Sequence, residues 1–111
     1  FLSLNIINEM TMRKVLFICA AGMSTSLLMN KMREYAASID YDVTVDAQPV
    51  GTVADTGQDA DVILLGPQIR FNLAKVKGMC PDKPVEAMDI QAYGTMNGQK
   101  IIDRVKEILG D

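Results

Sequence analysis

Cys19 and the small and hydroxyl-bearing residues after it form the part of the sequence best suited to chemistry. Residues 15–28 read VLFICAAGMSTSLL, a β-branched and aromatic run that leads through a cysteine and a glycine into helix formers. Backbone N–H groups of such a loop converge on one point, and the helix that follows adds the positive end of its dipole. The same field stabilises a thiolate by lowering the cysteine pKa from its usual value of about 8.5. We therefore expect a nucleophile and an anion-binding loop together at Cys19.

The loop also has a purely structural interpretation. Gly22 permits a close backbone approach that a Cβ would hinder, and the hydroxyls at 24–26 can bind an anion. They can equally cap the helix, with Cys19 a small hydrophobic residue at the end of a buried strand. Both interpretations use the same positions, and the residues alone leave both open.

Cysteine and histidine content limits the other chemistry. The chain has two cysteines and no histidine, so it holds neither a disulfide framework nor the four ligands of a structural zinc site. Catalysis by Ser-His or Cys-His pairs is excluded. Cys80 lies in KGMCPDKP with no glycine- and hydroxyl-rich helix entrance after it, and we predict a structural thiol there. We expect no metal, no cofactor and a reducing compartment.

Charge and hydrophobicity restrict the partners. Of the 111 residues 49% are hydrophobic and 23% charged, with a formal net charge of -3. Such a chain has no basic field for a phosphate backbone, which argues against nucleic acid. No apolar run reaches the roughly 20 residues of a membrane span, so we expect a soluble protein without membrane insertion. We predict one domain at 12–111, preceded at 1–11 by an extension that cloning added or that is frayed.

Strand and helix patterns alternate along the rest of the chain, which is typical of a parallel α/β sheet. Apolar or alternating runs predict four strands, and amphipathic periods predict helices after the first, third and fourth. A short helix or loop is expected at 50–58. The predicted strands are 14–19, 41–47, 61–66 and 83–88, and the two later helices are 68–78 and 97–109.

Right-handed crossovers favour an open doubly wound four-stranded parallel sheet of order 2-1-3-4 with helices on both faces. The switch point then lies between the first and third strands. Ligands of such sheets bind at the carboxyl ends of the strands beside the switch point. The loops at 19–26 and 66–70 are therefore expected to meet there.

Three segments, VLFICAAGMSTSLLMNKM, DVILLGPQIRF and AYGTMNGQKI, resemble the enzyme IIB component of the bacterial phosphoenolpyruvate-dependent sugar phosphotransferase system, lactose/cellobiose (chitobiose) type. The resemblance extends from Met12 to Leu109. It implies a cytoplasmic carrier whose cysteine accepts phosphate from a phosphohistidine of enzyme IIA. The carrier then passes the phosphate to a sugar bound by the membrane component, enzyme IIC.

Matching the motif position by position assigns roles to individual residues. Cys19 corresponds to the phosphorylated cysteine, and Pro67 and Gln68 fall in the neighbouring loop. The loop that surrounds the phosphate corresponds to Ala20, Ala21, Gly22, Met23, Ser24, Thr25 and Ser26. Roles for Arg70 beside the phosphate and for Tyr93 at the enzyme IIA contact stay open, since each also fits an ordinary structural position.

Three alternatives compete with the carrier. A low-molecular-weight phosphatase-like enzyme also forms a phosphocysteine, but its loop ends in an arginine that holds the phosphoryl oxygens; Thr25 stands at that position. A non-enzymatic anion-binding module would have no need of a thiol, and neither G-x-x-x-x-G-K-[ST] nor G-x-G-x-x-G is present. A redox thiol would favour Cys-x-x-Cys, which is absent.

Overall fold

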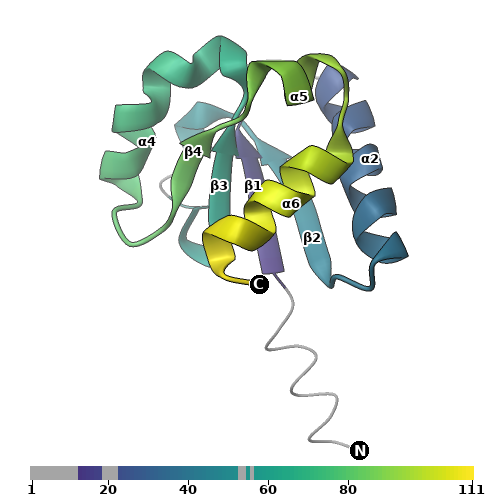
Figure 1. The fold of residues 1–111 in the computed structure, drawn as a ribbon. Coiled ribbons are helices and arrows are strands. Elements are labelled where there is room, and N and C mark those ends of the chain that lie inside the picture. The colour runs from purple at the N-terminus through teal and green to yellow at the C-terminus, as the bar shows by residue number, and fades with distance from the viewer. Residues whose placement is uncertain (1–12, 19–22, 53–54, 56) are drawn as a thin grey trace, which may run out of the picture.

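The centre of the computed structural model is a four-stranded parallel sheet in the order β2-β1-β3-β4. The structure describes residues 13–18, 23–52, 55 and 57–111; the expected extension at 1–11 and the loop residues at 19–22 lie outside these ranges. The predicted doubly wound sheet of order 2-1-3-4 is confirmed (Figure 1). Its strands are β1 (Arg13–Ile18), β2 (Val43–Gln48), β3 (Val62–Leu65) and β4 (Val85–Ala87).

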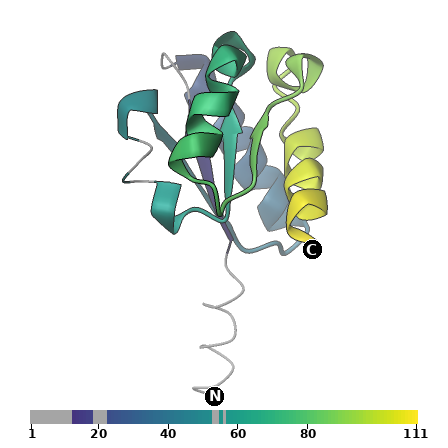
Figure 2. The ribbon, with the colours of Figure 1, turned by 90° about the vertical axis from the view of Figure 1, so that its left-hand side faces the viewer.

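Helices cover both faces of the sheet (Figure 2). One face carries α2 (Met23–Ser38), α5 (Ile90–Gly94) and α6 (Gly98–Leu109), whose buried side chains share a cluster with the sheet. The opposite face carries the 3-10 helix η3 (Pro67–Asn72) and α4 (Leu73–Met79). Two shorter 3-10 turns, η1 (Val50–Thr52) and η2 (Gly57–Asp59), follow β2.

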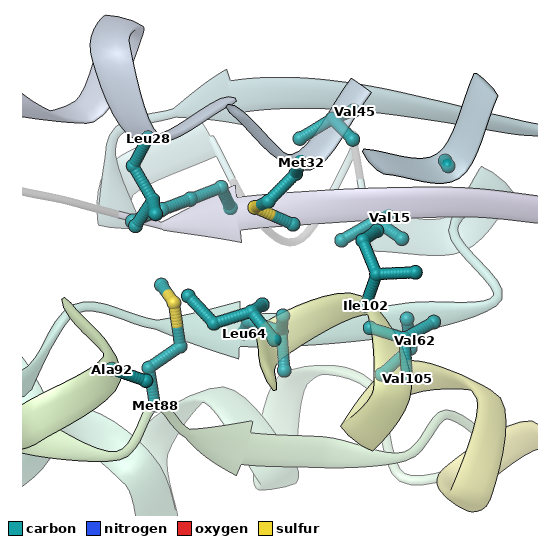
Figure 3. Packing of buried hydrophobic residues seen from close by; sticks show 13 residues of the cluster. Val15, Leu28, Met32, Val45, Val62, Leu64, Met88, Ala92, Ile102 and Val105 are labelled. Carbon is teal, nitrogen blue, oxygen red and sulfur yellow. The ribbon is translucent and has the colours of Figure 1, made fainter. Parts of the chain in front are cut away.

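The strands supply side chains to both layers, as expected of a parallel sheet. In β1, Val15 and Phe17 point into the α2 and α6 layer, whereas Leu16 and Ile18 point toward α4. All four residues of β3 are buried. Figure 3 shows how side chains from α2, α6 and the sheet meet in the first of these layers. Each large buried side chain of this kind stabilises the fold by about 1.5–3 kcal/mol. The sheet is therefore well packed on both faces, and it fixes the points from which the loops at its ends start.

The predicted helix at 68–78 is partly wrong, because it begins as a 3-10 helix. Ile69 interrupts the helical geometry with φ -117° and ψ 21°, and regular α-helix begins only at Leu73. Pro67 provides the start but donates no N–H, and Ile69 turns into the core. The structure also contains a short helix that was not predicted, α5, which Asp89 caps by accepting a hydrogen bond from Ala92 N–H at 2.9 Å.

Candidate functional site

The carboxyl ends of β1 and β3, from which the two predicted loops start, lie side by side. Gly66 N–H donates to the carbonyl oxygen of Ile18 at 3.0 Å. The chain therefore leaves β1 toward Cys19 directly beside the start of η3. This place is the switch point of the sheet, because β1 has β2 on its other side. Cys19, Ala20, Ala21 and Gly22 lie outside the described residues, so the expected meeting of the two loops stays a prediction.

The first turn of α2 supplies donors and a favourable electrostatic field for an anion. Residues 23–26 have a helical backbone and open a helix of 16 residues. The first N–H groups of a helix have no partner within it, and the helix dipole makes this end positive. No acidic residue stands in the first turn to occupy that field. Ser26, the last of the predicted loop residues, is exposed.

The neighbouring loop contributes a polar contact that the sequence does not reveal. Gln68 is exposed and its Nε2 donates to the hydroxyl of Tyr93 at 3.1 Å, which links η3 to α5. The Tyr93 ring leans on Phe17 of β1, with ring centroids 6.2 Å apart. Pro67 is half-buried and Arg70 is exposed. The amide of Gln68 and the hydroxyl of Tyr93 thus stand together beyond the carboxyl ends of β1 and β3.

Asp89 fixes the start of α5 and carries a negative charge there. Asp89 accepts a hydrogen bond from Ala92 N–H, and this bond lowers the pKa of the Asp89 carboxyl. The Lys100 ammonium group, 3.3 Å from Asp89 Oδ2, lowers this pKa further. An ionised Asp89 at a helix start is favourable. This cap orients α5 so that Tyr93, three residues past the first helical residue, reaches Gln68.

Three elements that begin at this end of the sheet, α2, η3 and α5 (Figure 1), each carry a large exposed apolar side chain. Leu27 in α2 is 50% exposed, Phe71 in η3 is 78% exposed and Ile90 in α5 is 60% exposed. Among the described residues the other large exposed apolar side chain is Ile39, which follows the far end of α2. The sequence contains a signal that Phe71 is exposed, because Phe71 lies off the apolar stripe formed by Ile69, Leu73 and Val76. We name Leu27, Phe71 and Ile90 the apical apolar residues.

Cys80 lies in a different environment from the predicted site. It follows α4 and is only 2% exposed, in the core layer on the α4 face. A Cβ at Gly57 would come within 2.6 Å of the Cys80 Sγ, which shows how closely the thiol is enclosed. The prediction of a structural thiol at Cys80 agrees with this burial.

The described ranges contain no group of three or more His, Cys, Asp or Glu side chains that could hold a metal ion. In the same ranges, no helix combines the length and apolar character that crossing a bilayer requires.

The fold is that of a small doubly wound α/β protein, and the candidate site lies at the switch point of its sheet. Residues 14–104 match the family model described as the PTS system, Lactose/Cellobiose specific IIB subunit. The chain belongs to this family, the lactose/cellobiose-specific IIB subunits of PTS systems.

Curated relatives agree with the family. The chain is 34% identical over 100 residues to the oligo-beta-mannoside-specific EIIB component of Bacillus subtilis (strain 168), covering 88% of this chain and 97% of the relative. It is 37% identical over 98 residues to the galactose-specific EIIB component of Lactococcus lactis subsp. cremoris (strain MG1363), covering 82% and 91%. Both are components of phosphotransferase systems.

Solved structures of two proteins share the fold. The cellobiose-specific IIB component of Borrelia burgdorferi superposes with a TM-score of 0.69 at 35% identity, covering 82% of this chain and 85% of the other. The lactose-specific IIB domain from Streptococcus pneumoniae reaches 0.76 at 24% identity, covering 86% and 96%, and supports the fold alone.

Proposed function

We propose that residues 12–111 act as a single-domain cytoplasmic phosphoryl carrier with Cys19 as the phosphorylated residue. The cysteine accepts phosphate from a phosphohistidine of enzyme IIA and passes it to a sugar bound by the membrane component IIC. The observation that carries the proposal is the family match over residues 14–104. It is supported by the position of Cys19 directly after β1 and four residues before α2 begins.

The transfer requires only a thiolate and a cradle for the phosphoryl oxygens. The Cys19 thiolate attacks phosphorus, the S–P bond forms and the P–N bond to the donor histidine breaks. In the second transfer a sugar hydroxyl attacks phosphorus, the S–P bond breaks, the thiolate is restored and the hydroxyl proton is released to water. Backbone N–H groups at the start of α2 suit the phosphoryl oxygens throughout, because they are oriented before the reaction. The loop residues 20–26, with Pro67 and Gln68 beside them, form this cradle in our proposal.

A carrier must hold its phosphate until the acceptor arrives, unlike a phosphatase. Thr25 stands where the phosphatase loop ends in arginine. Loss of one oxyanion donor costs an enzyme roughly a hundredfold or more in rate. We therefore propose slow hydrolysis of the phosphocysteine and fast transfer to the acceptor.

Enzymes IIA and IIC bind the same end of the molecule in succession, and the apical apolar residues suit this use. Leu27, Phe71 and Ile90 lie on three elements that begin at the carboxyl ends of strands. A carrier that exchanges partners needs a small interface, below about 1,200 Å² in total. We assign the selectivity for a particular sugar to the membrane component IIC, which binds the sugar.

Reconstitution of the relay tests the proposal. The chain is combined with phosphoenolpyruvate, enzyme I, the histidine carrier protein, enzyme IIA and membranes that contain IIC, and sugar phosphate is measured. We expect Cys19→Ser to abolish sugar phosphorylation and Cys80→Ser, as the matched control, to retain it once folding is verified. Transfer by Cys19→Ser at the rate of the unchanged chain would refute the assignment.

A further inference from the structure

Charged residues are separated by sign along the middle of the chain. Residues 34–61 contain no lysine or arginine, and their carboxylates are those of Glu34, Asp40, Asp42, Asp46, Asp55, Asp59 and Asp61. Residues 62–81 contain no carboxylate, and beyond Asp82 the basic stretch extends to Lys83. We name its cations, Arg70, Lys75, Lys77 and Lys83, the α4 cations. Because β2 lies in the acidic stretch and α4 in the basic one, the net charge of -3 conceals a basic surface.

The outer surface of α4 is a convex ridge with a lysine on each flank. Val76 is buried against the sheet, so Ala74 and Gly78, two positions before and after it, face outward and are exposed. Lys75 and Lys77, next to Val76 in the sequence, are exposed on the two sides of the helix, since successive helix residues are about 100° apart. Figure 2 shows α4 in green at the front of the molecule, following η3. We name Ala74, Lys75, Lys77 and Gly78 the α4 ridge.

The α4 cations are not neutralised by neighbouring carboxylates. Within the ranges that the structure describes, none of the four forms a salt bridge. Arg104 lowers the pKa of Glu86 most and holds both of its carboxylate oxygens, at 2.6 and 2.8 Å, and Lys77 adds only a smaller effect on that pKa. The positive charge of this surface is therefore available to an external anion.

A hollow beside α4 continues the basic surface. It has a volume of about 470 Å³, and Lys77, Lys83 and Arg104 line it against a single carboxylate, that of Glu86. Lys77 and Lys83 therefore lie near each other, although the first belongs to α4 and the second precedes β4. A phosphate group at the mouth of this hollow would meet more than one cation, and hydrogen bonds between charged groups are the strong ones.

We propose that the α4 ridge and the α4 cations form a peripheral contact with an anionic lipid surface. Each lysine or arginine near such a surface strengthens binding about fivefold. Small side chains on the ridge let the helix backbone approach the headgroups, while the long lysine side chains on its flanks reach the phosphates. A shaped protein partner suits this surface less, because binding hot spots are large side chains and the ridge exposes only alanine and glycine between its lysines.

The lipid contact leaves the candidate site uncovered. Helix α4 joins the parallel strands β3 and β4, so it runs back from the carboxyl end of β3 toward the amino end of β4. Phe71, which is 78% exposed and lies two residues before α4, has a side chain suited to the headgroup layer. Only the use of the contact rests on the proposed function, because a carrier held at the membrane meets the acceptor IIC more often. Lipid binding itself requires no phosphoryl transfer.

Co-sedimentation of the full chain with lipid vesicles at low salt tests the contact. We expect binding to vesicles of phosphatidylcholine mixed with an equal amount of phosphatidylglycerol, and none to phosphatidylcholine alone. Lys75→Glu should weaken binding by about tenfold or more, because it removes an attraction and adds a repulsion. Lys31→Glu, the same change at an exposed position of α2 on the other face of the sheet, is the matched control and should leave binding nearly unchanged.

Cys19→Ser should bind the vesicles as the unchanged chain does, which separates lipid binding from phosphoryl transfer. A chain that binds neither kind of vesicle overturns the proposal. Binding that Lys75→Glu does not weaken, or that Lys31→Glu weakens equally, also overturns it, because the α4 ridge would then not be the contact.

Two further measurements identify the surface and its ligand. With a spin-labelled headgroup lipid in the vesicles, the amide signals of residues 70–78 should broaden, while those of β2 keep their intensity; the reverse pattern would overturn the proposal. Millimolar glycerol phosphate should not displace the chain, because one phosphate cannot meet all four cations, and displacement would indicate a site for a free phosphoester instead. A Lys75→Glu variant that binds vesicles normally but accepts phosphate slowly from enzyme IIA would assign the surface to that protein and overturn the lipid contact.

Discussion

The two cysteines differ in the role that we propose for them, and their reactivity should differ accordingly. Cys80 is 2% exposed in the core, whereas Cys19 belongs to the loop for which we propose an activated thiolate. We predict that iodoacetamide modifies Cys19 much faster than Cys80 near neutral pH, because alkylation needs both a thiolate and access. Peptide mapping after timed alkylation measures both rates, and unfolding in urea should make them similar. Equal rates in the folded chain would favour the interpretation of Cys19 as a buried hydrophobic residue.

Phe71 is too exposed to contribute much to stability, so its substitution tests partner binding without a large change in the free energy of unfolding. We predict that Phe71→Ala changes the free energy of unfolding by less than about 0.5 kcal/mol and slows phosphoryl transfer from enzyme IIA several-fold, since exposed aromatic side chains are common binding anchors. Ile39→Ala, at the far end of α2, is the control and should leave transfer unchanged. A Phe71→Ala variant that accepts phosphate at the normal rate would remove Phe71 from the docking surface.

The residues of the candidate site can be proposed from the sequence, whereas the contacts around the site cannot. A cysteine, a glycine and hydroxyl residues between a strand pattern and a helix pattern are local features, and the sequence displays them directly. The hydrogen bond between Gln68 and Tyr93 joins residues 25 positions apart. This hydrogen bond depends on α5, a short helix that begins after the Asp89 cap. A helix of five residues is too short to show an apolar period in the sequence.

Helices α2 and α6 touch where α6 begins, and the contact depends on a glycine. A Cβ at Gly98 would lie 2.5 Å from the backbone carbonyl carbon of Lys31. We predict that Gly98→Ala destabilises the chain by about 1–3 kcal/mol through overpacking. Gly78, inside α4, has no atom within 4 Å of such a Cβ, so Gly78→Ala should stabilise by about 0.5–1 kcal/mol. Urea unfolding measures both, and a neutral Gly98→Ala would show that the two helices separate without cost.

Strands and long helices were predictable because their patterns are regular. Val62 to Leu65 is a continuous apolar run and forms the central buried strand β3. The amphipathic period from 97 to 109 gives α6, bounded by the Asn97 cap, whose side chain accepts from Lys100 N–H. The 3-10 start of the helix after β3 was not predictable, because Ile69, Leu73 and Val76 follow the period of a regular α-helix, while the backbone departs from that geometry at Ile69.

Carboxylates bonded to cations or to backbone N–H groups make the whole molecule sensitive to acid. Arg104 lowers the pKa of Glu86, Arg13 and Tyr41 lower that of Asp111, and the Ala92 N–H lowers that of Asp89. The unfolded chain therefore takes up protons at higher pH than the folded one. The resulting stability is present above the ordinary carboxyl pKa of about 4 and is lost as the pH falls through the lower values of the folded state.

We predict that the urea midpoint falls steeply below about pH 4. Glu86→Gln should lower the free energy of unfolding by at most about 1 kcal/mol at neutral pH, since the pair with Arg104 is half-exposed. The same substitution should make the loss of stability in acid smaller. Urea unfolding at a series of pH values measures both effects. A midpoint that rises on acidification would contradict the sign of these pKa shifts.

The most direct measurement of the central claim is the location of the phosphate after the relay has run without sugar. Intact mass followed by tandem mass spectrometry of the peptide that contains residues 15–28 gives both the number of phosphoryl groups and their position. The account predicts one phosphoryl group on Cys19, retained until IIC and sugar are added and then lost to the sugar. An anion-binding module would gain no covalent phosphate, and a phosphatase would lose it to water at once. Phosphate on Cys80, or no phosphate on the chain while the relay turns over, would contradict the account.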